Sequence, residues 1–325
     1  MLLKFLNKHF GDRVPLPKPT TSDPEISRFF DKIDYLGSYR NDYFPKTGPV
    51  MWLDQENYRD LIKSKLKNNE ISENDAEICE NFAKDGYVVI NKLISDEECD
   101  SAWNGFIKAI DDHVINPGPE PKEFDPKWGR VGNVHHYVKE MHKILHHPNI
   151  VKKLDMLMGK KTIPYQTIPS LYGSEQLAHS DAIHMTTFPL GYMSAAWVAL
   201  EDIHEDSGPL EYYPGSHKLP YHLSKEVGIK INESNNYGRE PYLNKYEPHI
   251  QNIIEKNKLE KKFFNAKKGD VLLWHHNLIH AGSKVNNTSV TRKSIVCHYF
   301  TENVFAYHDL TNSAADVAGN GDFKL

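Results

Sequence analysis

The spacing of apolar residues is helical over the first part of the chain. Residues 54–66, 72–86, 95–110 and 135–158 carry apolar side chains at intervals of three and four residues. Two of these segments begin with a serine that is followed three residues later by an acidic residue, which is typical of a helix start. Residues 86–91 interrupt the helical pattern with β-branched side chains and predict a strand.

From Thr162 onward the pattern changes to short strands between turns. We predict strands over residues 163–168, 193–201, 209–213, 270–275 and 290–300. Several short strands separated by turn residues indicate a β-sandwich or barrel. Because the helices come first and the strands later, the helices are expected to pack outside the β core. The predicted fold class is therefore mainly β with flanking helices.

Some segments differ in composition from this core. Residues 1 to about 50 are rich in proline and predict an extended arm that lies over a surface. Residues 222–262 are polar, rich in lysine and asparagine and partly helical, which indicates an insertion between strands. The predicted organisation is an arm with helices packed on the core over residues 1–80, a main domain over 81–305 and a C-terminal tail over 306–325.

Composition and charge exclude several classes of protein. The chain has 325 residues, of which 39% are hydrophobic and 26% charged, and its net charge is −5 without a basic stripe, so no nucleic-acid partner is expected. The three cysteines are far apart and form no C-x-x-C pair, which suits a reducing compartment. No stretch approaches the ~20 apolar residues that cross a membrane. We therefore expect a cytoplasmic protein with no membrane association.

A short motif in the second half of the chain points to metal binding. The chain has 18 histidines, so a single histidine means little, and spacing has to identify candidates. His179 and Asp181 form an H-x-D pair, and on a strand two such side chains would point to the same face. A second histidine would complete two imidazoles and one carboxylate, the set that leaves positions open on iron(II).

The third ligand is expected within residues 268–283, which predict a strand, a short turn and a second strand. His280 is favoured over His275 and His276 because two small residues follow it and Arg292 comes twelve residues later. A guanidinium is the natural partner of a co-substrate carboxylate, although a surface ion pair is the alternative interpretation of this arginine. Ser294 would share the face of Arg292 and could assist it.

These motifs resemble the phytanoyl-CoA dioxygenase family in order and spacing. The resemblance covers roughly residues 80–303, and its strongest segments are Phe82–Ile90, Gly173–His184, Trp197–Ile203, Ser207–Lys218 and Gly269–Phe300. It implies a double-stranded β-helix, or jelly roll, with helices on one side. It also implies an enzyme that uses iron(II), 2-oxoglutarate and O2 to hydroxylate an unactivated carbon, releasing succinate and CO2.

The resemblance also implies roles for individual residues. The iron ligands would be His179, Asp181 and His280, and the 2-oxoglutarate contacts would be Arg292, Trp197 and, as a weaker match, Gln166. The turn that contains His217 matches a family signature, and its role is expected to be structural because proline and glycine set a tight turn there.

The substrate and two rival functions stay open at this point. A small-molecule substrate is expected, and an anionic one would suit the basic residues of the insertion, Lys225, Lys230, Arg239 and Lys245, unless these simply belong to a solvated loop. Near the H-x-D motif, the expected pocket residues are His184, Met185 and Tyr192. The rivals are a catalytically inactive jelly-roll sensor and a zinc hydrolase that uses the same three ligands. The oligomeric state cannot be inferred from this chain.

Overall fold

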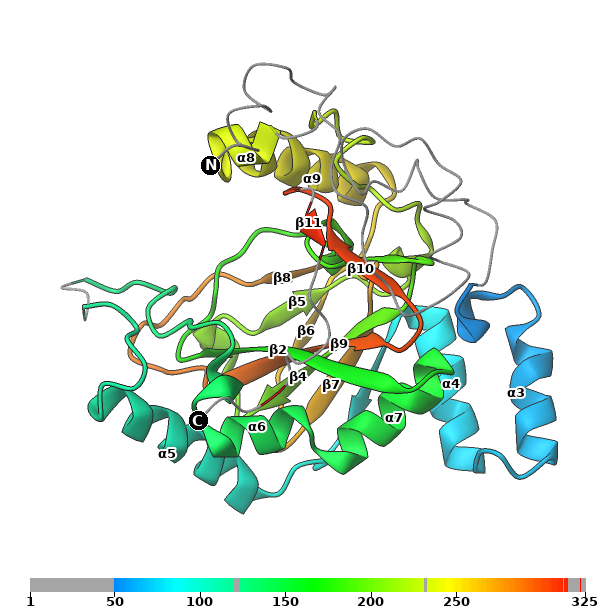
Figure 1. Cartoon of the computed structure of the whole chain (residues 1–325), viewed down its shortest axis with the longest axis horizontal. Coiled ribbons are helices and arrows are strands. Elements are labelled where there is room, and N and C mark those ends of the chain that lie inside the picture. The colour runs from blue at the N-terminus through cyan, green and yellow to red at the C-terminus, as the bar shows by residue number, and fades with distance from the viewer. Residues whose placement is uncertain (1–49, 120–122, 231–232, 312, 315–321, 323–325) are drawn as a thin grey trace.

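The computed structural model describes residues 50–119, 123–230, 233–311, 313–314 and 322, and Figure 1 shows helices around a central group of strands. The predicted arm lies outside the described residues, apart from Val50. The α-helices are α3 Tyr58–Lys67, α4 Glu73–Asp85, α5 Asp96–Asp111, α6 Lys139–Leu145, α7 Pro148–Met158, α8 Glu233–Tyr237 and α9 Glu247–Lys256. The strands are β1 Tyr87–Ile90, β2 Thr162–Ser170, β3 Thr186–Phe188, β4 Met193–Ala199, β5 Leu210–Tyr212, β6 Lys262–Phe264, β7 Val271–His275, β8 His280–Gly282, β9 Ser294–Thr301, β10 Phe305–His308 and β11 Ser313–Ala314.

These strands form antiparallel sheets. The largest sheet has five strands in the order β1-β7-β4-β9-β2, and two three-stranded sheets have the orders β6-β5-β8 and β11-β10-β3. In the centre of the large sheet, Trp197 of β4 lies opposite Leu272 of β7 and Val296 of β9. Because side chains alternate along a strand, this sheet has one face toward the helices and one toward the β6-β5-β8 sheet, which we call the small sheet.

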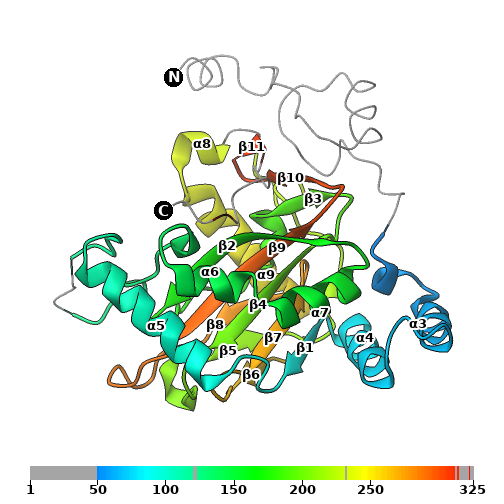
Figure 2. The same ribbon diagram turned by 60° about the horizontal axis from the view of Figure 1, so that its bottom comes forward.

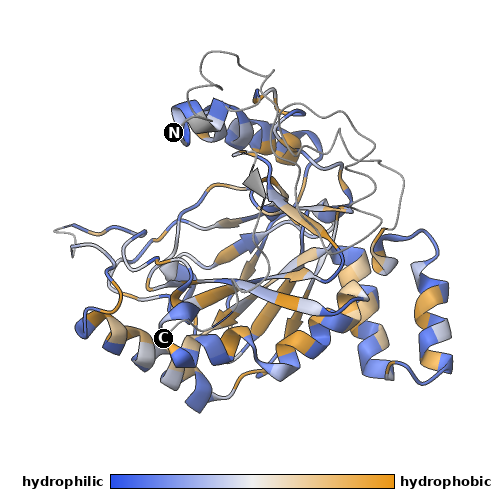
Figure 3. Ribbon diagram, viewed as in Figure 1, coloured by the Kyte–Doolittle hydropathy of each residue, from blue (hydrophilic) through white to orange (hydrophobic). Residues whose placement is uncertain are grey.

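The two faces of the large sheet belong to different parts of the core. Leu273 of β7 and Val198 of β4 pack with the helices, whereas Leu272 and Trp197 pack with Phe264 of the small sheet. Figure 3 accordingly shows the strands in the middle of the molecule mostly in orange. Successive side chains of these strands therefore lie in two different apolar environments. Both faces are buried, which is why the strands are almost continuously hydrophobic.

The helices cover the outer face of the large sheet. Figure 2 shows α5, α6 and α7 lying across it, with α3 and α4 at one end. The predicted helix starts are confirmed, because Ser72 and Ser95 each accept a hydrogen bond from the backbone N–H three residues later and form complete capping boxes. The fold class expected from the sequence, mainly β with flanking helices, is confirmed.

The structure differs from the predicted elements at several places. The helix predicted over 135–158 is divided into α6 and α7, because Pro148 begins a new helix at a position where the missing N–H is harmless. The strand predicted from Val290 begins only at Ser294. At the start of the predicted tail, the strand β10 (Phe305–His308) pairs with β3. Among the described residues, no helix is long and apolar enough to cross a membrane.

Candidate metal centre

Two facing backbone segments carry the three predicted metal ligands. His179 and His280 form an isolated antiparallel bridge in which each backbone N–H donates to the other's carbonyl, at 3.0 and 2.9 Å. Asp181 does not lie on a strand as predicted, but begins a short 3-10 helix, Asp181–Ile183. The intervening Ser180 is extended, so the aspartate still turns to the side of the histidine. Side-chain donor atoms of all three residues lie within 4.8 Å of one another.

Backbone carbonyls orient both imidazoles. His179 Nδ1 lies 2.9 Å from the carbonyl oxygen of Leu177, and His280 Nδ1 lies 3.0 Å from that of Leu278. Since a carbonyl can only accept, each Nδ1 carries the proton and each Nε2 keeps its lone pair. These two Nε2 atoms lie 4.0 and 3.7 Å from Oδ1 of Asp181. The residues present therefore fit a divalent metal ion, because two nitrogen lone pairs and a carboxylate oxygen converge.

The second carboxylate oxygen of Asp181 has a partner that sequence reasoning missed. The indole N–H of Trp274 donates to Oδ2 at 2.7 Å, and the Trp274 ring also packs against the His280 ring with centroids 4.8 Å apart. Trp274 lies in β7, and alternation along this strand turns its side chain toward the ligands. One residue thus holds the aspartate and supports a histidine, leaving Oδ1 directed toward the two Nε2 atoms.

Burial and neighbouring histidines shape the charge of this site. Burial alone would raise the pKa of Asp181, but His280, His298, His179 and the Trp274 N–H outweigh it and lower the pKa below its usual range. Burial, with His280 as the next cause, lowers the pKa of His179 well below its ordinary value. The aspartate is therefore ionised and His179 neutral at pH 7, which are the protonation states that a metal ion needs.

Arg292 is a buried cation that faces the metal ligands across a cavity. It lies just before β9, and its backbone N–H donates to the Leu171 carbonyl at 2.7 Å. Arg292 is 3% exposed. One of its guanidinium nitrogens donates a hydrogen bond to the Gly208 carbonyl at 3.0 Å, and its Nε has no hydrogen-bond partner among the described residues. Burial, and then the charge of Arg130, lower the pKa of Arg292 to about 9, so the group stays protonated at neutral pH. Among the described residues no carboxylate pairs with it, which favours an anionic ligand.

A cavity of about 180 Å³ joins the three ligands to this arginine. Its wall includes two of the predicted co-substrate contacts, Gln166 and Trp197, and the Trp197 ring centroid lies 5.5 Å from Cζ of Arg292. Ser294 is not part of the wall, although its hydroxyl is buried without a partner.

The other candidate histidines have separate places. His275 turns to the opposite face of β7, where it contacts Asp54, and His276 contacts the Met185 carbonyl at 2.6 Å. His217 lies 3.3 Å from the Ala83 carbonyl, in keeping with the structural role expected for its turn. His184 lines the cavity, and burial lowers its pKa to about 3.

A wider cavity of about 690 Å³ lies next to the first and shares four residues with it, Arg130, Ser174, Gln176 and His184. Of the basic insertion residues, Arg239 lines this outer cavity, whereas Lys245 bonds to Glu233 at 2.7 Å. Met185 lines the inner cavity as expected, but Tyr192 packs in the core beneath the helices. Arg130 was not predicted, because it lies on a loop 49 residues before His179 with no periodic pattern around it.

The fold is shared with proteins of known structure. The carbocyclase SnoK of nogalamycin biosynthesis is 15% identical with a TM-score of 0.54, and the match covers 82% of this chain and 92% of SnoK. EctD from S. alaskensis, solved with 2-oxoglutarate and 5-hydroxyectoine, is 18% identical with a TM-score of 0.54, covering 71% of this chain and 76% of EctD. At these identities the likeness concerns the fold, and the expected double-stranded β-helix is confirmed.

The interior of this double-stranded β-helix gathers two histidines and an aspartate beside a buried arginine, and two histidines with one carboxylate are the ligand set typical of non-haem iron(II) sites. Residues 82–294 match the model of the phytanoyl-CoA dioxygenase family, and the chain belongs to that family. A curated relative, phytanoyl-CoA dioxygenase domain-containing protein 1 of Danio rerio, is 28% identical over 42% of this chain. The match spans 63% of that relative, which is less than two thirds of its length.

Proposed function

We propose that this chain is an iron(II)- and 2-oxoglutarate-dependent dioxygenase that hydroxylates an unactivated carbon of a small molecule and releases succinate and CO2. One observation carries the proposal. A buried, protonated arginine, which pairs with no carboxylate among the described residues, shares a cavity with three converging metal-ligand side chains. A dicarboxylate that reaches from the metal to Arg292 would satisfy both ends of this cavity at once.

Each residue of the site then has a role of its own. His179, Asp181 and His280 would hold the metal, and bound iron would supply the oxidation chemistry that no side chain provides. Arg292 would bind the far carboxylate of 2-oxoglutarate, and the flat Trp197 ring would limit where the carbon chain can lie. Gln166 lines the same cavity and would contact the co-substrate, whereas Ser294 would act on it only indirectly. The three ligands and Arg292 are buried, which would limit the access of bulk water to the reacting atoms.

The outer cavity is where we place the substrate. It borders the metal cavity through His184 and Arg130, and its volume of about 690 Å³ suits a small metabolite. Lys127, Arg130 and Arg239 contribute positive charge to its wall, against Glu175 and Glu247. This supports a substrate that carries an anionic group, as the insertion residues suggested, with Arg239 now preferred over Lys245.

Two rival functions make different predictions. A zinc hydrolase would use the same three ligands but has no need of a buried arginine in the metal cavity. A catalytically inactive sensor would bind 2-oxoglutarate without consuming O2. Neither rival explains as many features of the cavity, but both are separable by experiment.

An anaerobic titration tests the proposal at the level of binding. Iron(II) and 2-oxoglutarate are added to the purified chain, and the visible charge-transfer band of the chelate is recorded. We expect a saturable band for the wild type, a much weaker one for Arg292→Ala, and an unchanged one for Lys293→Ala. The control residue is adjacent and cationic, but its Nζ pairs with Glu201 at 3.2 Å. A wild-type chain that gives no band would contradict the proposal.

A further inference from the structure

Apart from the two adjoining cavities at the metal ligands, the structure has another cavity away from the metal centre, which we call the second cavity. Its volume is about 650 Å³, and none of its described lining residues lines the cavities around the metal ligands. The two regions meet at β7, where Trp274 faces Asp181 and the next residue, His275, faces this second cavity. His275 also packs edge-on against Phe82 of α4, with ring centroids 6.1 Å apart. The cavity is therefore on the helix side of the sheet.

Most of the cavity wall is apolar and aromatic. Tyrosine, phenylalanine and leucine side chains come from four separate parts of the chain: Leu53, Tyr58, Phe188, Leu190, Tyr221 and Tyr307. A volume of several hundred Å³ with such a wall falls within the ~300–1,000 Å³ typical of small-molecule sites. The wall would therefore accept the apolar body of a ligand.

One carboxylate, whose side chain is 28% exposed, gives the cavity its polarity. Asp54 Oδ2 lies 3.2 Å from His275 Nε2, and His275 Nδ1 accepts a hydrogen bond from the Asn277 backbone N–H at 3.0 Å. Nε2 therefore carries a proton and donates a hydrogen bond to Asp54. Burial alone would raise the pKa of Asp54, but His275 outweighs it and lowers the pKa, so the carboxylate is ionised.

The described part of the cavity wall carries more negative than positive charge. Among the residues that the structure describes, no lysine or arginine forms an ion pair with Asp54. The charged side chains that line the cavity are Asp54, Glu56 and Glu226, against Lys218 alone. The Asp54 carboxylate has a single imidazole donor and keeps capacity for a further donor, and a cation would fit it best because hydrogen bonds between two charged groups are the stronger ones.

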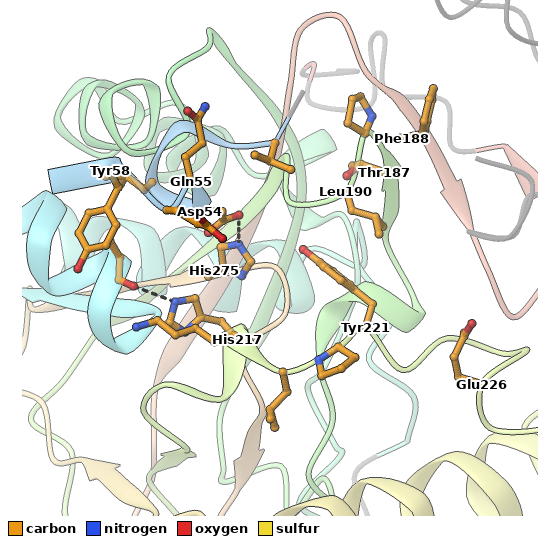
Figure 4. Close-up of a pocket in the computed structure, with 18 of the residues that line it drawn as sticks. Asp54, Gln55, Tyr58, Thr187, Phe188, Leu190, His217, Tyr221, Glu226 and His275 are labelled. Carbon is orange, nitrogen blue, oxygen red and sulfur yellow. Dashed lines mark hydrogen bonds and ion pairs between the residues drawn. The ribbon is translucent and has the colours of Figure 1, made fainter. Parts of the chain in front are cut away.

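Tyr221 lies across the cavity from Asp54 and faces it. In Figure 4 its hydroxyl is directed toward Asp54 and His275, which a dashed line joins. A Cβ built on Gly191 would lie 3.2 Å from Asp54 Oδ2 and 3.6 Å from the Tyr221 hydroxyl, so the two groups border one position. The tyrosine rings of the wall also offer π faces that attract cations.

We propose that this cavity binds a small organic cation, with its ammonium group on Asp54 and its apolar body against the aromatic wall. The proposal concerns a site separate from the metal centre and does not depend on the reaction there. The charge of the wall disfavours an anionic ligand, because a carboxylate would meet Asp54 and two further acidic residues, against Lys218.

Three ligands of nearly equal size test the charge preference. The full chain is titrated by calorimetry at pH 7 with 2-phenylethylammonium, the neutral 2-phenylethanol and the anionic 3-phenylpropionate. We expect the cation to bind at least about tenfold more tightly than the alcohol, as one ion pair of about 1.4 kcal/mol would give, and the anion not to bind. Equal binding of the cation and the alcohol would overturn the proposal.

Variants locate the site. Asp54→Asn keeps the size of the side chain and should lose the preference for the cation, whereas Asp60→Asn, at a residue that is 80% exposed on α3, should keep it. Leu190→Trp should weaken the binding of both the cation and the alcohol, because the larger side chain fills the cavity. If Asp54→Asn does not fold, this variant shows whether the ligand binds in the cavity. His280→Ala should leave cation binding unchanged. Loss of binding in His280→Ala, or full binding in both cavity variants, would place the ligand elsewhere.

Discussion

The hydrogen bond from Trp274 to Asp181 gives the sharpest test of how the metal ligands are organised. Trp274→Phe keeps an aromatic ring beside His280 but removes the N–H that donates to Oδ2 at 2.7 Å. Trp274 is 1% exposed and Asp181 4% exposed, so water cannot readily replace the lost donor. A hydrogen bond to a charged group contributes about 1.5–3 kcal/mol. Loss of a group that orients a metal ligand commonly lowers metal affinity by about 10–100-fold.

We therefore expect Trp274→Phe to bind cobalt(II) about 10–100-fold more weakly than the wild type in an anaerobic titration. The metal-free variant should also be less stable to urea by about 1–3 kcal/mol, because the buried carboxylate loses a donor. Trp52→Phe is the matched control, since it removes an indole hydrogen bond to the Met156 carbonyl at 3.0 Å, far from the ligands. The control should lose some stability and no metal affinity. Equal metal affinity in Trp274→Phe and the wild type would refute this reasoning.

Three further predictions concern the co-substrate, the packing and the second cavity. Arg292→Lys should weaken 2-oxoglutarate binding by about tenfold or more, because an ammonium cannot form the two parallel bonds of a guanidinium; unchanged affinity in the chelate titration would count against its role. Gly282→Ala should lower the free energy of unfolding in urea by about 1–3 kcal/mol, since the added methyl group would meet Ser174 Oγ and the Glu175 backbone nitrogen. An unfolding midpoint equal to that of the wild type would contradict this prediction. Asp54 has a lowered pKa in the folded chain, so its charge contributes stability that is present above its unfolded pKa of about 3.9 and is lost as pH falls through the folded pKa. Asp54→Asn should therefore destabilise the chain at pH 7 and progressively less as pH falls below about 4; a pH-independent difference would exclude this linkage.

Local sequence signals predicted much of this architecture. The serine caps of α4 and α5 are local signals, because the capping residue and its partner lie three positions apart. The H-x-D motif and His280 could be paired by their spacing to neighbouring residues, and the structure brings them together. The assumption of a strand at the motif was wrong, yet an extended Ser180 has the same effect on its neighbours.

Other features depend on contacts between distant parts of the chain. Trp274 meets Asp181 across 93 residues, and His275 meets Asp54 across 221 residues. No periodic pattern relates such pairs, and a tryptophan inside a hydrophobic strand is simply expected to be part of the core. Arg130 comes from a loop, where side-chain direction follows from tertiary packing. The start of β9 was misplaced because residues 290–293 continue the pattern of the strand but form a bend and a loop.

Oxygen consumption tests the central claim most directly. The iron-loaded chain is given 2-oxoglutarate and O2, candidate substrates are screened for stimulation, and succinate is measured alongside O2 uptake in the wild type, Arg292→Ala and Lys293→Ala. We predict uptake with matching succinate formation in the wild type and in Lys293→Ala, and a reduction of at least about tenfold in Arg292→Ala. Equal succinate formation by Arg292→Ala and the wild type, or turnover that needs neither iron nor O2, would contradict the proposed function.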